Sequence, residues 1–240
     1  MIIAQNHPVA PIDDDALAAS LRGLETRSEP EPYAALQHVI DAAHHLFGLS
    51  GAGLMLVDET GDLRYVTASD EAGRELEHAQ LELGLGPCID CVLKDRVVPS
   101  EDLLHDPAWP LLGERVAPQV RALLGVPVRL YGAPVGSLNV FRNEPSGWDD
   151  SDRRAMVAYG EVVEQILAAA IHVGQQSRLA EQLQAALNGR VVVERAVGFL
   201  MARLDVDETI AFETLRRRAR KARRKVVDVA TDLLARLPEN

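Results

Sequence analysis

A run of cations near the end of the chain is the pattern that most clearly indicates a chemical task. Eight of the ten residues from 216 to 225 are basic: Arg216, Arg217, Arg218, Arg220, Lys221, Arg223, Arg224 and Lys225. Like charges at this density repel one another unless a polyanion neutralises them. Solvated helix faces usually alternate charge signs and this run does not, which favours a nucleic acid as its partner. No aromatic residue lies within the run, so base stacking by this segment is not predicted.

Three short amphipathic helices are predicted to position these cations. Apolar residues recur at helical spacing through residues 183–238. The first helix is expected to bury Val192, Ala196, Phe199 and Leu200, the second Ile210, Ala211, Leu215, Ala219 and Ala222, and the third Val226, Val229, Ala230 and Leu233. Short helices of this kind are stable only when their apolar stripes pack together. The segment is therefore predicted to form an all-α domain.

The same segment resembles the ANTAR domain, the three-helix RNA-binding module of transcription antitermination regulators. The matching residues are Leu187-x-x-Arg190-x-x-x-Glu194-x-Ala196-x-Gly198-x-Leu200-Met201, then Ala211-Phe212-x-x-Leu215-Arg216-x-x-Ala219, then Val229-Ala230. The resemblance implies binding, as a dimer, to paired RNA stem-loops, which prevents a terminator from forming. It also implies RNA contacts by Arg190, Arg195, Ala196 and Gly198, the small residues letting RNA approach the backbone. Many members have Lys where this chain has Val197, which would remove a phosphate contact.

Charge divides the chain into two parts. Its 240 residues carry a net charge of -11, yet residues 174–240 hold 13 Lys and Arg against nine Asp and Glu. Residues 1–173 hold 12 against 27. An acidic part repels nucleic acid and a basic part attracts it, so two domains with separate tasks are predicted. No apolar run is long enough to span a bilayer and no signal peptide is recognised, so a cytoplasmic protein without a membrane partner is expected.

Residues 33–170 are predicted to form an α+β domain, preceded by a tail and a short helix over 1–32 that the acidic cluster Asp13-Asp14-Asp15 caps. Its first helix is expected over Tyr33–Phe47, with one side formed by Leu36, Val39, Ile40, Ala43 and Phe47. Two hairpins, over 52–68 and 122–141, the second around Tyr131-Gly132-Ala133, are expected to form an antiparallel sheet with helices on one face. The segment resembles a GAF domain, the sensor module that commonly precedes ANTAR domains in actinobacterial regulators. The matches are Gly86-Pro87-Cys88-x-Asp90, Leu124-Gly-Val-Pro-Val and Gly136-Ser-Leu-Asn-Val-Phe141. The resemblance implies the fold but names no ligand, and an unknown small molecule stays open as a partner.

A Cys-x-x-Cys pair, Cys88 and Cys91, is the second pattern that could do chemistry. It fits two inert packing residues, a reversible disulfide, or half of a metal site. Zinc needs four ligands and the chain has only two cysteines, so no metal or other cofactor is predicted. Gly86-Pro87 is expected to begin a helix, which would place both thiols on one face and favour a thiolate on Cys88. Packing remains the favoured interpretation.

No group of residues has the spacing of a catalytic set. Ser100, Asp102 and His105 occur together, but neither a nucleophile elbow nor an oxyanion loop accompanies them. His105 and Trp109 lie in a predicted loop over Leu103–Leu112, where GAF-like domains form the lid of their pocket. Both residues are therefore candidate sensor residues, and the chain is predicted not to be an enzyme.

A helix without proline is predicted from Asp149 to about Leu187. Residues recur in it with the steps of a heptad, all apolar except Gln176: Val162, Ile166, Ala169, Val173, Gln176, Ala180, Leu183 and Leu187. This seam predicts a homodimer, with residues 171–187 as a coiled-coil-like linker.

The sequence thus predicts a signal-responsive antitermination regulator. One alternative is a DNA-binding regulator, which the dense arginines favour but which lacks a helix-turn-helix glycine turn before the basic helix. The other is a redox or ligand sensor that acts only through protein contacts.

Overall fold

The computed structural model describes residues 11–25, 31–48, 50–58, 63–173, 178–222 and 224–235. The chain divides into two compact units. The first joins Met1–Leu56 to Tyr65–Ala170, and the second joins Val57–Arg64 to Ile171–Asn240. Within the described residues, no helix is both long enough and apolar enough to cross a membrane.

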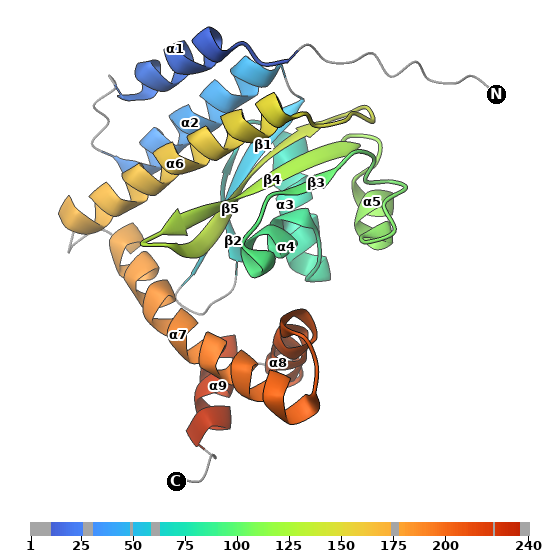
Figure 1. The fold of residues 1–240 in the computed structure, drawn as a ribbon, viewed down its shortest axis with the longest axis vertical. Coiled ribbons are helices and arrows are strands. Elements are labelled where there is room, and N and C mark those ends of the chain that lie inside the picture. The colour runs from blue at the N-terminus through green and yellow to red at the C-terminus, as the bar shows by residue number, and fades with distance from the viewer. Residues whose placement is uncertain are drawn as a thin grey trace. The chain divides into compact units, whose positions relative to one another are not determined.

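The first unit is built on a five-stranded antiparallel sheet (Figure 1). Its strands are β1 (Gly51–Val57), β2 (Leu63–Ala68), β3 (Val98–Ser100), β4 (Ala122–Leu130) and β5 (Ala133–Arg142). They lie in the order β2-β1-β5-β4-β3. The predicted α+β class with an antiparallel sheet is confirmed.

The turn between β4 and β5 shows why this hairpin was predictable. It consists of two residues, Tyr131 at φ 52° and Gly132 at φ 80°. Two successive positive φ angles match the right-handed twist of the flanking strands, and glycine adopts such an angle without a steric penalty. The predicted hairpin over 122–141 is confirmed, with a turn one residue shorter than the Tyr-Gly-Ala segment suggested.

Helices cover both faces of the sheet, so the expectation of helices on one face is wrong. On one face, a Cβ on Gly125 of β4 would lie 3.7 Å from the Cβ of Cys91, which belongs to α4 (Pro87–Lys94). On the other face, the side chain of the next residue, Val126, lies 3.6 Å from the Cβ position of Gly160, which belongs to α6 (Asp150–Val173). Successive side chains of a strand point to opposite faces. Both β4 and β5 are accordingly buried along almost their whole length.

Two further helices lie on the α6 side, α1 (Asp14–Glu25) and α2 (Pro32–Phe47) (Figure 1). The α2 residues predicted to share one side are all buried: Leu36, Val39, Ile40, Ala43 and Phe47. The Asp13 carboxylate accepts a hydrogen bond from Ala16 N at 2.8 Å and so caps α1, as the acidic cluster predicted. Ser20 on α1 hydrogen-bonds the Tyr159 hydroxyl on α6 at 2.7 Å.

The opposite face carries α3 (Glu71–Leu83) and α4, and α5 (Pro110–Val116) follows β3. The predicted helix start at Pro87 is confirmed, with Gly86 as its N-cap. The helix α5 was not predicted, because its seven residues follow a proline-interrupted segment and its N-cap, Trp109, makes no side-chain capping bond. The predicted loop over Leu103–Leu112 therefore ends three residues early, at Trp109.

The predicted helix from Asp149 to Leu187 corresponds to two elements. α6 ends at Val173 and α7 (Arg178–Leu204) begins at Arg178. Residues 174–177 between them, which include Gln176 of the predicted seam, lie outside the described residues. The side chains of three other seam residues are likewise outside the description: Val173, Ala180 and Leu183.

The described seam residues of α6 are less buried than a neighbouring stripe of the same helix. That stripe consists of Met156, Tyr159, Val163, Leu167 and Ala170, all buried. Val162 and Ile166 lie one position away from this stripe and are half-buried, and Ala169 is exposed. A second apolar stripe thus runs beside the first.

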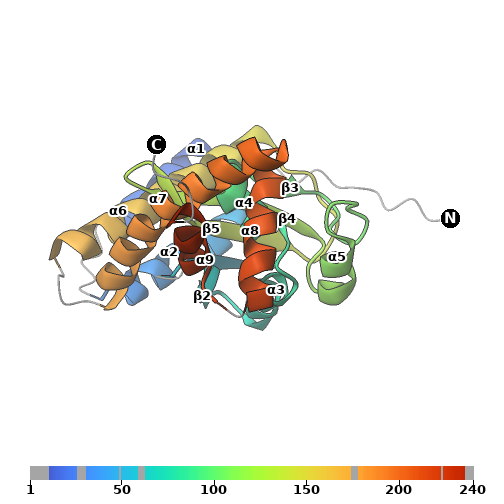
Figure 2. The same cartoon turned by 90° about the horizontal axis from the view of Figure 1, so that it is seen from below.

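The second unit contains α7, α8 (Glu208–Ala222) and α9 (Val226–Ala235), and both shorter helices contact α7 (Figures 1 and 2). Their core consists of Val193, Ala196, Val197, Leu200, Ala211, Leu215, Ala219, Val226 and Ala230. The predicted all-α domain is confirmed in its main contacts. Among the residues predicted to be buried, Ile210 and Ala222 are exposed, and four others are only half-buried: Val192, Phe199, Val229 and Leu233.

Candidate functional site

The basic run extends past the helix on which it was predicted. α8 ends at Ala222, so Arg224 and Lys225 lie in the connection to α9. Arg223 lies outside the described residues, and so does the side chain of Arg220, whose backbone belongs to α8. The run therefore covers the last two turns of α8 and the connection that follows.

Two of the cations form ion pairs with acidic side chains of the same unit. Arg216 pairs with Glu213 at 3.3 Å, covers the ring of Phe212 at 5.9 Å from its centroid, and leaves only 16% of its side chain exposed. Arg224 pairs with Asp232 across the connection. Their charges are therefore partly compensated before any partner binds.

Three other cations of the run share one exposed surface of α8. Arg217, Arg218 and Lys221 are all exposed. Lys221 lies four residues after Arg217 and three after Arg218, and residues at these spacings are neighbours on a helix. The Arg217 guanidinium donates to a neutral oxygen, Thr214 Oγ1, at 3.4 Å. We call Arg217, Arg218 and Lys221 the α8 cation patch.

The residues expected on α7 from the resemblance separate into two groups. Arg195 and Gly198 are exposed, and Arg190 pairs with Glu194. Ala196 is fully buried in the core with residues of α8 and α9, and its contact with RNA stays a prediction. Val197 is buried in the same core.

The first unit contains a buried polar cluster that the sequence did not reveal. Its members are Glu77 and Gln80 on α3, Cys88 on α4 and Asn139 on β5, all fully buried. Asn139 Nδ2 donates to Glu77 Oε1 at 2.9 Å, and Gln80 Nε2 donates to Glu77 Oε2 at 3.2 Å. Gln80 Oε1 in turn accepts from Cys88 N at 2.9 Å. The cluster therefore connects α3, α4 and the sheet.

Glycines provide the space for these polar side chains. A Cβ on Gly53 would lie 2.6 Å from Glu77 Oε1, and one on Gly86 would lie 2.3 Å from Gln80 Oε1. Gly86 also has a φ of 144°, which side-chain-bearing residues rarely adopt. The available sequence signal was Glu77 and Gln80, two polar residues that share the helix face of the buried Leu76.

Burial governs the protonation of this cluster. It raises the pKa of Glu77 to about 7, although the hydrogen bond from Asn139 opposes the shift. Burial also raises the pKa of both thiols, for Cys88 with a further contribution from the Glu77 charge. Burial therefore opposes the thiolate that was expected on Cys88. Both cysteines are free and buried, which matches the packing interpretation.

The other sensor candidates are not brought together. His105 is exposed and bonds Asp102 Oδ2 through Nδ1 at 2.7 Å, whereas Trp109 is 7% exposed. Ser100 Oγ donates to Asp106 at 2.8 Å, so these residues do not form a Ser-His-Asp relay. Across the described part of the chain, no cluster of three or more His, Cys, Asp or Glu residues is suited to a metal ion.

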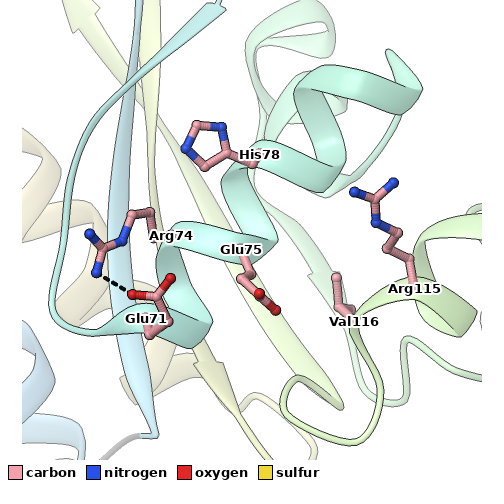
Figure 3. A pocket seen from close by; sticks show the side chains of 6 residues that line it. All are labelled: Glu71, Arg74, Glu75, His78, Arg115 and Val116. Atoms are coloured by element: carbon pink, nitrogen blue, oxygen red, sulfur yellow. Dashed lines mark hydrogen bonds and ion pairs between the residues drawn. The ribbon is translucent and has the colours of Figure 1, made fainter.

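A surface pocket of about 350 Å³ lies between α3 and α5 (Figure 3). Its lining is Glu71, Arg74, Glu75, His78, Arg115 and Val116. The side chains from α3 and those from α5 stand on its two sides, and an ion pair joins Glu71 to Arg74 (Figure 3). Small-molecule pockets are mostly apolar, and this lining is mostly charged. The pocket has the size but not the usual lining of a ligand site.

Comparison with protein families identifies both units. The family model of the GAF domain matches residues 30–168, and that of the ANTAR domain matches residues 181–234. The chain belongs to the GAF domain family and carries an ANTAR domain after it, the architecture of a GAF and ANTAR domain regulator. A comparison with curated proteins finds no match.

Solved structures share the fold of the first unit. The GAF domain of an Acinetobacter phosphoenolpyruvate-protein phosphotransferase is 17% identical, with a TM-score of 0.55 over 67% of this chain and 95% of that one. A free methionine-R-sulfoxide reductase from Neisseria meningitidis, solved with its substrate, is 17% identical, with a TM-score of 0.54 over 71% and 99%. These similarities support the GAF fold, and at this identity they transfer no chemistry.

Proposed function

We propose that this protein is a signal-responsive transcription antitermination regulator that binds RNA stem-loops through α7–α9 under the control of its GAF domain. The observation that carries the proposal is the α8 cation patch, three exposed cations on the surface of an ANTAR domain. A surface that neutralises phosphates gains affinity by releasing the counterions of the nucleic acid. The acidic first unit repels nucleic acid and leaves binding to the second.

The GAF domain supplies the regulation in this proposal, and the chain is not an enzyme. A signal, such as the binding of a small-molecule ligand to the GAF domain, changes whether the ANTAR domain can bind RNA. Because a ligand that binds only the folded state stabilises it, such a ligand would raise the unfolding temperature of the full chain in a thermal-shift measurement.

Two other functions compete with RNA binding. A DNA-binding regulator would use α8 in a major groove, and a sensor acting through protein contacts would dock α8 on an acidic partner. A competition experiment separates them: the full chain is bound to a labelled RNA hairpin and challenged with unlabelled hairpin or unlabelled duplex DNA. We expect the hairpin to compete and the duplex to compete weakly. Stronger competition by the duplex would favour DNA, and failure to bind either would favour the protein partner.

We further propose a homodimer through the second apolar stripe of α6. Its support is that Val162 and Ile166 are only half-buried although the residues next to them, Val163 and Leu167, are fully buried. An Ile166→Asp variant is expected to sediment as a monomer and to lose RNA affinity, because paired stem-loops require two copies of the domain. Val157→Asp is the matched control, since Val157 is exposed on another side of the same helix. An Ile166→Asp variant with an unchanged sedimentation coefficient would contradict this interface.

A further inference from the structure

A stripe on α7 combines an aromatic ring with two cations. Arg195, Phe199 and Arg203 follow one another at steps of four, so they are neighbours along one side of the helix. Arg195 and Arg203 are exposed, and Phe199 is half-buried. The guanidinium carbon of Arg203 lies 5.6 Å from the centroid of the Phe199 ring.

Phe199 stands at the edge of the three-helix core rather than within it. At 100° per residue it lies about 60° from Ala196 and about 100° from Leu200, both of which point into the core. Phe212 makes a similar local pair with Arg216, but its ring packs against that core and Glu213 holds its arginine. The two Phe–Arg pairs are alike in spacing, and both rings are half-buried, but Arg203 is exposed whereas Arg216 is half-buried.

The surface beside the Phe199 ring is open. Gly198 is exposed, and no atom lies within 4 Å of the position of a Cβ there. Ala202, three residues after Phe199, is exposed as well. Small side chains at these two positions let a ligand approach the backbone of α7 next to the ring.

We propose that Phe199 stacks an unpaired base of the bound RNA, while Arg195 and Arg203 hold the phosphates on either side of it. The proposal rests on the RNA-binding function proposed above. Bases in RNA loops are recognised by stacking on aromatic rings and on guanidinium planes. The base can therefore stack on the Arg203 guanidinium, or on the Phe199 ring after Arg203 has moved away from it. Stacking needs no particular base, because every base has a π face.

The test compares Phe199→Leu with the wild-type full chain on a labelled RNA hairpin at several salt concentrations. Leucine keeps an apolar side chain at the edge of the core but offers no ring. We expect affinity to fall about tenfold, the usual effect of losing one base–aromatic stack. The dependence on salt should stay unchanged, because the ring neutralises no phosphate. Phe199→Trp should retain the affinity, and its indole fluorescence should be quenched on binding.

Phe212→Leu is the matched control, and thermal unfolding shows that each variant is folded. Phe212→Leu is expected to lower the unfolding temperature and leave RNA affinity near wild type. Wild-type affinity in Phe199→Leu would overturn the stacking role, as would an equal loss in folded Phe212→Leu or a reduced salt dependence in Phe199→Leu. A wild-type chain that binds no RNA would instead overturn the proposed function.

Discussion

Replacing Glu77 by Gln is expected to remove most of the loss of stability that the wild-type chain shows as pH rises from about 4.5 to 7. The folded-state pKa of this buried carboxyl is about 7, against an ordinary value of 4.5. Between these values the native state keeps a proton that the unfolded state has released, so raising the pH favours unfolding. This difference in pKa between the folded and unfolded states corresponds to about 3 kcal/mol of folding stability, which is lost completely once the pH is above 7.

Urea unfolding at a series of pH values across this window, followed by circular dichroism, measures the effect. The slope of stability against pH is the diagnostic quantity, because Gln at position 77 would also place an amide group against the Gln80 amide and lower stability at every pH. Glu75→Gln is the matched control, since Glu75 is exposed on the same helix. Equal slopes in the wild-type and Glu77→Gln chains would show that this carboxyl does not titrate in the window.

Replacing Arg217, Arg218 and Lys221 together by Gln is expected to weaken binding to an RNA hairpin and to flatten its salt dependence. Three lost phosphate contacts reduce the slope of log affinity against log salt by about 2 to 3. The helix itself should not be weakened, because like charges three and four residues apart repel one another. A loss of affinity in this variant would therefore report on binding rather than on folding.

Fluorescence anisotropy between about 50 and 200 mM salt, where such contacts have their largest effect, measures the slope. The matched control replaces Arg96, Arg115 and Arg154, three exposed cations of the first unit, and changes the net charge equally. We expect the control to bind with the wild-type slope. If the α8 variant also keeps that slope, the patch is a solvated helix face.

Local patterns in the sequence predicted most of the elements. The period of the apolar residues in α2 and α9, the position of the turn after β4 and the acidic start of α1 depend on neighbours along the chain, and all three were recognisable. The motifs also indicated the two domains that the family comparison shows. The helix α5 was missed because its seven residues are too few to display a period.

Only the tertiary structure decided which side chains are available for chemistry. Asn139 and Glu77 are 62 residues apart in the chain, and no local pattern indicates that they bond beneath the sheet. Ala196 and Gly198 belong to one short motif, yet packing of α8 and α9 buries the first and leaves the second exposed. Helical spacing places residues on faces, but the elements packed against each face determine burial. Burial in turn determines the cost of a charge such as that of Glu77, and whether a ring such as that of Phe199 can meet a ligand.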